Sequence, residues 1–265
     1  MLFTIITVCY NSSRTIRQTF DSVLSQACLD YEYIVVDGSS TDGTADFIQE
    51  YEPKFQGRMR WFSEPHSGIY DAMNKGIHMA KGDYINFMTP DNWFADEALS
   101  ATKKAIVDNP GQGVYYGMTR IVNAQGQELI VERFHHSKIP ELMSYYQSQF
   151  ISRSAIFKIG LFDTQYRVSA NYDMGMKLSL SKANFCPMEH LVAVFRIDGL
   201  SDFEDRRCAH EENLVRIYHG LLDGARYRRE CLRNKLCRQV TNVLFGIYCV
   251  ARWPLRQLSK LRQWG

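Results

Sequence analysis

The sequence predicts an α/β protein whose first half folds as a doubly wound, mostly parallel sheet. Strand-like and helix-like segments alternate through the first hundred residues. The strand-like segments are apolar on both faces, as expected for strands that helices cover on both sides. Because parallel strands joined by helices take right-handed crossovers, this alternation predicts one open sheet with helices on both faces.

Four segments have the composition of buried parallel strands, and three segments with helical periodicity lie between them. The strands are predicted at residues 3–10, 33–37, 58–63 and 83–88. The helices are predicted at residues 14–26, 44–51 and 69–80.

The pattern changes after about residue 110. Residues 114–122 and 128–134, joined by the turn NAQG, predict an antiparallel hairpin that adds an edge to the sheet. Later segments predict helices at 155–161, 173–181 and 211–238, and a strand at 191–197. We therefore predict one α/β domain over residues 1–224, followed by a helical C-terminal tail at 225–265.

The net charge of +2 conceals a strong asymmetry. The tail at 225–265 holds ten basic side chains and one acidic one, a charge of +9, which leaves −7 on the remainder. Aromatic and aliphatic residues are interleaved with the basic ones, so we expect this tail to contact an anionic membrane surface and not a nucleic acid. The alternatives are a solvated basic helix and a helix packed on the body or on a partner subunit.

The seven cysteines form an odd set with no C-x-x-C pair, so the sequence predicts neither a disulfide framework nor a structural zinc site. The first basic residue, Arg14, follows an apolar run that lacks the pattern of a signal peptide. Residues 240–250 are apolar but too short to span a bilayer. These features predict a reducing, cytoplasmic location, with peripheral attachment to the inner face of the cell membrane.

Polar residues follow each of the four predicted parallel strands. Ligands bind beyond the carboxyl ends of such strands, so these loops predict one carboxylate-rich cleft containing Asp37, Asp42 and Asp91. One carboxylate could accept from a nucleobase and another could hold a divalent cation on a diphosphate. The alternative is that these residues only cap helices and turns. Glycine-rich phosphate loops are absent, because the nearest approach to G-x-G-x-x-G has Tyr116 at its last position.

Three segments resemble the family 2 glycosyltransferases of the GT-A fold. They read TIITVCYN at 4–11, VVDGSSTDGT at 35–44 and SEPHSGIYDAMNKGI at 63–77. The resemblance covers roughly residues 2–200 and is closest to bacterial enzymes of colanic-acid, O-antigen and capsule biosynthesis. It implies metal-dependent transfer, with inversion, of a sugar from a UDP-linked donor to a saccharide acceptor. It also implies Mn²⁺ or Mg²⁺ as cofactor and a lipid-linked oligosaccharide as acceptor.

The resemblance also assigns residues to the donor site. Thr7, Tyr10 and Asp37 match positions around the nucleobase and ribose, and Asp91 matches the metal-binding acid. Asn92 stands where the subgroup often has a second acid. Asp71 and Asn74 are expected either to touch the ribose or sugar or to pack a helical turn. The nucleotide-sugar-binding set is therefore Thr7, Tyr10, Asp37, Asp71, Asn74 and Asp91, with Asp91 also the metal ligand.

The catalytic base is expected within residues 169–178. Many relatives have an acid where this chain has Asn171, so Asp173 is the nearest carboxylate. Two residues along a helix turn a side chain by about 200°, so Asp173 can replace that acid only if Asn171 precedes the helix. The alternative for Asp173 is an ion pair with Lys177. Tyr146 also departs from the histidine that relatives often have there.

Two other functions remain open at this point. Asn92 and Asn171 are consistent with a non-catalytic glycosyltransferase-like scaffold in a polysaccharide assembly. A sugar nucleotidyltransferase shares the architecture, but its first loop would normally be glycine-rich with Arg or Lys, and residues 10–13 have neither. The glycosyltransferase is the function that we predict.

Overall fold

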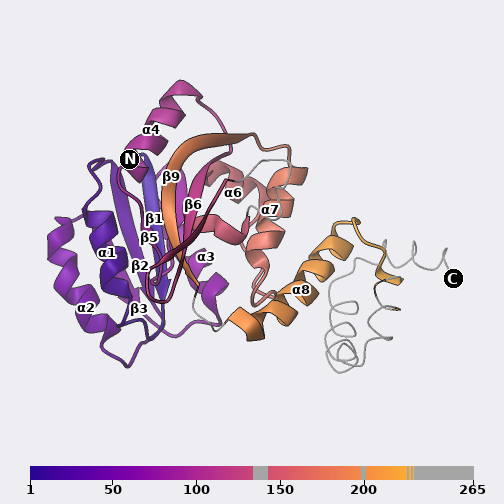
Figure 1. Cartoon of the computed structure of the whole chain (residues 1–265), viewed down its shortest axis with the longest axis horizontal. Coiled ribbons are helices and arrows are strands. Elements are labelled where there is room, and N and C mark those ends of the chain that lie inside the picture. The colour runs from indigo at the N-terminus through magenta and orange to yellow at the C-terminus, as the bar shows by residue number, and fades with distance from the viewer. Residues whose placement is uncertain (134–142, 198–200, 226, 228, 230–265) are drawn as a thin grey trace. The chain divides into compact units, whose positions relative to one another are not determined.

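The computed structural model describes residues 1–133, 143–197, 201–225, 227 and 229 (Figure 1). Two compact units are present, residues 1–212 and 213–265. The strands are β1 Phe3–Cys9, β2 Tyr31–Asp37, β3 Met59–Ser63, β4 Tyr84–Phe87, β5 Trp93–Phe94, β6 Val114–Asn123, β7 Glu128–Glu132, β8 Gln149–Ser152 and β9 Phe185–Ile197. The α-helices are α1 Ile16–Leu24, α2 Thr44–Tyr51, α3 Ile69–Met79, α4 Ala98–Asp108, α6 Arg153–Ile159, α7 Ala170–Leu180 and α8 Ser201–Tyr218.

The described strands form one mixed sheet in the order β3-β2-β1-β4-β8-β6-β9-β5, with β7 paired to β6. β3, β2, β1 and β4 are parallel, which confirms the predicted α/β fold. β8 is antiparallel to both β4 and β6. In Figure 1, α1 and α2 lie on one side of the parallel strands, and α3, α6 and α7 lie on the other.

The register of the parallel strands brings their carboxyl ends together. β1 and β2 are buried along their whole length, and Cys9 at the end of β1 pairs with Asp37 at the end of β2. Asp37 in turn pairs with Ser63, the last residue of β3. The loops that follow these strands therefore leave the sheet at one edge, where a ligand site is expected.

Aromatic packing anchors α1 to the sheet. The Phe20 ring lies 5.9 Å from Tyr33 on β2 and 5.1 Å from Tyr51 at the end of α2. Phe20 is fully buried, as is Phe55, whose ring centre lies 5.2 Å from that of Tyr33. Truncating such a ring to alanine costs about 3–5 kcal/mol of stability. This cluster fixes the helix that follows the first polar loop.

The second half of the sheet differs from the prediction in two respects. The hairpin strand β6 does not form an edge, because β8 and β9 flank it on either side. β5 and β8 have only two and four residues and were not predicted. Such short strands carry too little alternation to identify them, and their partners lie far away in the sequence.

The helix predicted over 211–238 is found in part: a helix runs from Ser201 to Tyr218, the chain leaves helical structure at 219–223, and residues 230–238 lie outside the described residues. Gly220 stops it by adopting φ +74°. The amide of Leu221 then donates back to the Arg216 carbonyl at 2.8 Å, which is the usual end of a helix at a left-handed glycine. Most of the predicted tail, residues 225–265, lies outside the described residues.

Candidate active site

A cavity of about 710 Å³ opens at the carboxyl ends of the parallel strands. It is lined by Val8, Cys9, Tyr10, Asn11, Ser12, Arg14, Thr15, Asp42, His66, Ile69, Thr89, Pro90 and Asp91. These residues come from the loops after all four parallel strands, as the sequence predicts. Of the predicted site residues, the structure places Tyr10, Asp42 and Asp91 on the cavity wall.

Hydrogen bonds fasten the first loop to the second. The amide of Asn11 donates to Ser40 Oγ at 2.8 Å, and its side-chain oxygen accepts from the amide of Thr41 at 2.9 Å. The amide of Ser13 donates to Asp42 at 2.9 Å. Asn11 holds φ +49°, a left-handed conformation that asparagine tolerates better than most residues. Hydrogen bonds between backbone amides and side-chain oxygens thus hold the loops after β1 and β2 together at the cavity.

Asp37 is fully buried and does not line the cavity. Its carboxylate accepts from the amide of Ser40 at 3.0 Å, from Ser40 Oγ at 2.5 Å and from Ser63 Oγ at 2.6 Å. These bonds tie the end of β2 to the end of β3 and satisfy a buried charge. Asp37 therefore organises the loop beneath the cavity in this structure.

Two titratable groups on the wall have shifted pKa values. Burial, followed by the nearby Asp37 carboxylate, raises the pKa of the Cys9 thiol far above its usual range. Burial also raises the pKa of Asp42, but hydrogen bonds from Thr44 and Ser13 outweigh it and hold that pKa well below the usual range. Near neutral pH the wall therefore presents a neutral thiol and an ionised carboxylate.

Gly38 and His66 fit together beside Asp37. A Cβ on Gly38 would lie 2.5 Å from Nε2 of His66, so any larger residue at position 38 would require the imidazole to move. The amide of Gly68 donates to His66 Nδ1 at 3.3 Å. Sequence reasoning singled out neither His66 nor Arg14 as a site residue. The sequence feature that could have identified them is their position in polar loops that follow parallel strands, with His66 shortly before α3 and Arg14 shortly before α1.

The structure gives three other predicted donor-site residues internal partners. Thr7 is buried, and its hydroxyl is 2.8 Å from the Tyr33 hydroxyl. Asp71 accepts from the amide of Ser67 at 2.9 Å at the start of α3. The amide group of Asn74 makes two hydrogen bonds to the backbone of Phe162, at 2.9 and 3.0 Å. Neither Asp71 nor Asn74 is among the residues that line the cavity.

Asp91 and Asn92 are neighbours in the chain but lie in different environments. Asp91 lies on the cavity wall, whereas the Asn92 side chain is buried. The Asn92 amide group donates to Thr89 Oγ1 and accepts from the amide of Arg196 at 2.8 Å. Thr19 on α1 also donates to the Asn92 carbonyl at 2.7 Å. Asn92 thus holds the loop that presents Asp91.

Asn171 is the second residue of α7, so it does not precede the helix. Its Oδ1 accepts a 3.0 Å hydrogen bond from the Tyr70 hydroxyl. Asp173 is 1% exposed, and its Oδ2 lies 2.6 Å from Lys177 Nζ. The predicted ion pair is therefore present, and the condition on which Asp173 could replace an acid at 171 is not met. Asp173 is also absent from the cavity lining.

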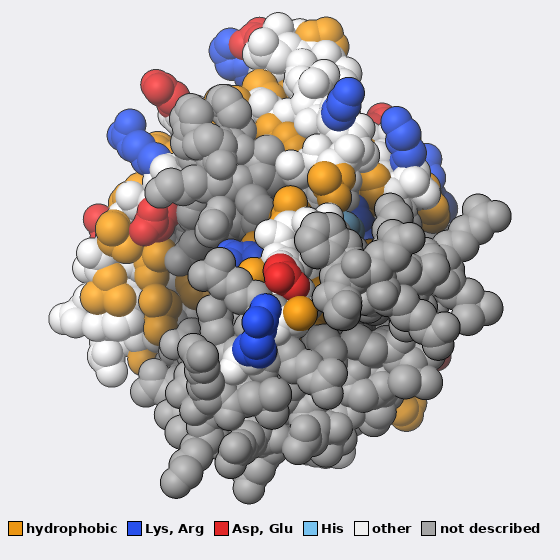
Figure 2. All heavy atoms as spheres, turned by 90° about the vertical axis from the view of Figure 1, so that its right-hand side faces the viewer, with side chains coloured by type: hydrophobic (Ala, Val, Ile, Leu, Met, Phe, Trp, Pro, Cys, Tyr) orange, Lys and Arg blue, Asp and Glu red, His pale blue; other side chains and the backbone are white. Residues whose placement is uncertain are grey.

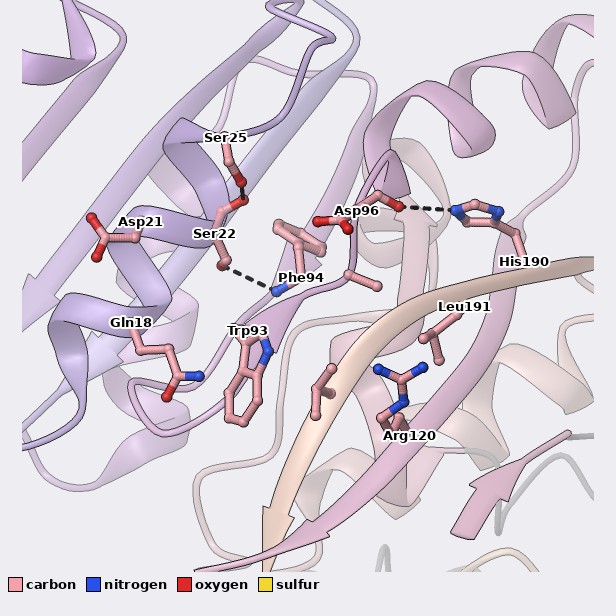
Figure 3. A pocket seen from close by; sticks show the side chains of 12 residues that line it. Gln18, Asp21, Ser22, Ser25, Trp93, Phe94, Asp96, Arg120, His190 and Leu191 are labelled. Atoms are coloured by element: carbon pink, nitrogen blue, oxygen red, sulfur yellow. Dashed lines mark hydrogen bonds between the residues drawn. The ribbon is translucent and has the colours of Figure 1, made fainter. Parts of the chain in front are cut away.

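A second hollow of about 550 Å³ lies between α1, β5 and β9 (Figure 3). Trp93, Asp96, Arg120 and His190 are among its lining residues. Arg120 is ion-paired with Glu128 at 2.8 Å, and His190 Nε2 is 3.2 Å from the Asp96 carbonyl. Several of its polar groups thus serve contacts within the protein, and it shares no lining residue with the first cavity.

A mixed sheet with a carboxylate-bearing cavity at the ends of its parallel strands is the arrangement of the GT-A glycosyltransferases. Residues 4–169 match the sequence profile of glycosyl transferase family 2. The chain belongs to this family, whose members are nucleotide-sugar glycosyltransferases.

Relatives and solved structures agree with this assignment. A PGL/p-HBAD biosynthesis glycosyltransferase of Mycobacterium bovis is 27% identical over 195 residues, which is 72% of this chain and 75% of that protein. Chondroitin synthase of Pasteurella multocida is 27% identical over 64% of this chain and 18% of its own length. S. aureus TarS in complex with UDP has a TM-score of 0.68 at 20% identity, covering 90% of this chain and 77% of that chain. A Pyrobaculum calidifontis mannosyltransferase, in complex with GDP-Man and Mn²⁺, has a TM-score of 0.60 at 16% identity, covering 84% and 64%.

Proposed function

We propose that this enzyme transfers a sugar from a UDP-linked donor, with inversion, to a saccharide acceptor in cell-surface glycan biosynthesis. The observation that carries the proposal is the cavity built by the loops after β1, β2, β3 and β4, with Tyr10 and Asp91 on its wall. The names of relatives support the glycan setting. The TarS structures, which include UDP and UDP-GlcNAc complexes, support a uridine nucleotide.

The donor would occupy the cavity with its base toward the Asp37 loop and its diphosphate toward Asp91. Tyr10 is 60% exposed at the cavity and offers an aromatic face to the base. For Asp37 to accept from the base, it would have to exchange one of its serine hydrogen bonds. Thr7, Asp71 and Asn74 would support the donor site indirectly, by holding β1 and α3 in place without lining the cavity.

A divalent cation is the proposed cofactor, and Asp91 on the cavity wall is the carboxylate that would hold it. Within the described residues no group of three or more His, Cys, Asp or Glu side chains could hold a metal ion. Mg²⁺ and related ions nevertheless bind commonly through one or two carboxylates together with substrate phosphates. We propose that Asp91 is the protein ligand for Mn²⁺ or Mg²⁺. When bound, such an ion would neutralise charge on the diphosphate.

For the general base we retain Asp173. It is the carboxylate nearest to Asn171 in the sequence, and because it is buried and paired with Lys177, a local opening would be needed before it reaches an acceptor. The base would take the proton of the acceptor hydroxyl as that oxygen attacks the anomeric carbon.

The basic tail supports a place at a membrane. No helix of the described residues is long and apolar enough to cross a bilayer. On the face shown in Figure 2, the described Lys, Arg, Asp and Glu side chains are interspersed. We propose that residues 225–265 hold the enzyme on anionic lipid at the cytoplasmic face, near a lipid-linked acceptor.

A donor panel tests the function directly. Purified full-length protein would be incubated with UDP-, GDP- and dTDP-linked sugars and a set of saccharide acceptors, with Mn²⁺ or with a chelator. We expect turnover or hydrolysis of at least one UDP-sugar only with metal. Binding of UDP without turnover of any donor would favour the non-catalytic scaffold, and preference for GDP would contradict the uridine assignment.

A further inference from the structure

We propose that Arg14 binds the diphosphate of the donor and stabilises the nucleoside diphosphate as it leaves. The proposal rests on the donor site described above and assigns a charge-neutralising role to a residue that the family resemblance did not assign. Arg14 lies between the end of β1 and the start of α1, on the wall of the 710 Å³ cavity.

The backbone on both sides of Arg14 is fixed, although its side chain is exposed. The amide of Ser12 donates to Thr44 Oγ1 at 2.8 Å, and the amide of Ser13 donates to Asp42. After Arg14, the amide of Thr15 donates to the carbonyl of Ser12 at 3.1 Å. The backbone that carries the guanidinium is therefore already held in place. Binding an anion would cost only the conformational entropy of ordering the Arg14 side chain.

Arg14 supplies positive charge to a cavity that otherwise has acidic groups. Among the described residues that line it, Arg14 is the only lysine or arginine, and Asp42 and Asp91 are carboxylates. Within the described part of the chain, Arg14 makes no hydrogen bond or ion pair. An arginine fork recognises phosphate oxygens in two-point geometry, which suits a diphosphate in this cavity.

The position of Arg14 near the start of α1 is also unfavourable for the stability of that helix. It lies two residues before α1, whose first turn contains no acidic residue. The start of a helix carries partial positive charge, so a cation there is unfavourable, whereas an anion bound between the two would be stabilised. Arg17, one turn further, shows the contrasting case, because it is paired with Glu50 at 2.9 Å.

The positive charge of Arg14 would stabilise the leaving group of the proposed reaction. The bond between the anomeric carbon and the diphosphate oxygen breaks, and its electron pair stays on that oxygen. The acceptor oxygen forms the new bond, and its proton passes to the base. The leaving nucleoside diphosphate thus gains negative charge in the transition state, where a guanidinium stabilises it more than in the ground state.

Calorimetry on the full chain with Mn²⁺ tests the proposal, using UDP and uridine as probes. Arg14→Gln should weaken UDP binding about tenfold and leave uridine binding within about twofold, because uridine lacks the diphosphate. Arg14→Lys should recover part of the loss. Arg17→Gln is the matched control, since it removes the same charge from the same region but away from the cavity. Arg14→Gln should also lower kcat more than it raises KM.

Unchanged UDP affinity in Arg14→Gln, or an equal loss of UDP and uridine binding, would overturn the role of Arg14. An effect of Arg17→Gln as large as that of Arg14→Gln would do so as well, because it would indicate a general field effect. If the unaltered protein binds no UDP with Mn²⁺, the donor assignment itself fails. These two failures are therefore distinguishable in one series of titrations.

Discussion

The Tyr70 hydroxyl donates a 3.0 Å hydrogen bond to Oδ1 of Asn171, which joins α3 to α7 across 101 residues of sequence. The same oxygen lies 2.5 Å from the Val168 carbonyl oxygen, so the single hydroxyl proton is shared between the two acceptors. Nearby, Glu211 accepts from the amides of Val168 and Ser169 at 2.9 and 3.0 Å. The start of α7, where relatives often carry the catalytic acid, is therefore held from two sides.

This arrangement predicts that Asn171→Asp will be tolerated and will raise turnover. An aspartate has the same shape and accepts the Tyr70 hydrogen bond at least as well, since charged acceptors make stronger bonds. Turnover of the preferred UDP-sugar should rise by about tenfold or more as a base is supplied. Asn171→Ala is the control, and equal rates for both variants would show that position 171 does not face the acceptor.

Asp173→Asn should cut turnover by about 10²–10⁴-fold with little change in UDP affinity if Asp173 is the base. Lys177→Met removes the other half of the same ion pair and should leave turnover of the folded enzyme far less affected. Melting temperatures measured alongside separate folding from chemistry. If both variants lose stability together and keep their turnover, Asp173 has only the structural role that its ion pair indicates.

Asp91→Ala should abolish metal-dependent binding of UDP. The carboxylate lies on the cavity wall and is the proposed ligand, and without it a cation keeps only the diphosphate and water. Asp96→Ala removes the same charge five residues later, from the lining of the second hollow, and should leave UDP affinity unchanged. Titration of UDP with Mn²⁺ and with chelator measures both. Equal affinity in the two variants would remove Asp91 from the donor site.

A partly buried charge network across β1, β2 and β3 should make the fold sensitive to acid. Glu32 is 3% exposed and accepts from Thr4 Oγ1 at 2.7 Å and from Arg60 at 2.6 Å. Burial raises the pKa of Glu32, but these bonds and one from the Lys81 amide outweigh it, so the pKa is lowered. The unfolded chain then binds more protons than the folded one as pH falls, and stability declines below the ordinary glutamate range.

Glu32→Gln tests this network. It should lower stability at neutral pH by about 1.5–3 kcal/mol, the range for hydrogen bonds to charged groups, and flatten the loss of stability toward acid. Glu50→Gln is the control, because Glu50 pairs with Arg17 and Lys54 at the exposed surface, where such pairs contribute little. Denaturant midpoints between about pH 2.5 and pH 7 decide the result, because the loss occurs as pH falls below the ordinary glutamate range. Parallel curves for Glu32→Gln and the unaltered protein would refute the coupling.

The parallel half of the sheet was predictable because its signals are local. Residues 3–9 and 31–37 are mostly apolar runs bounded by polar loops. The positions of these loops at the strand ends depend on the local sequence and not on distant segments. β8 was not predictable, since four residues carry little pattern and its neighbours β4 and β6 are far away in sequence. The position of the cavity followed from the fold.

The tasks of individual site residues were less predictable than their location. Asp37 ends β2 and Asp42 follows it by five residues, yet Asp37 is fully buried under serine hydroxyls and Asp42 is exposed. That difference depends on Ser63, which another strand brings alongside. Likewise, the helix predicted at 173–181 begins at Ala170, so Asn171 lies inside it. Glu211, which is distant in sequence, accepts from the Ser169 amide just before this helix.

The last prediction concerns the tail at 225–265. Each basic group near an anionic headgroup layer contributes about 1 kcal/mol, an attraction that fades within a Debye length. The full chain should therefore sediment with anionic vesicles at low salt, detach at high salt and ignore neutral vesicles. Truncation before Ala225 should abolish binding. Because truncation could also unfold the chain, the combined substitutions Arg252→Glu, Arg256→Glu and Lys260→Glu provide an intact variant, and vesicle binding that survives them would contradict membrane attachment through this tail.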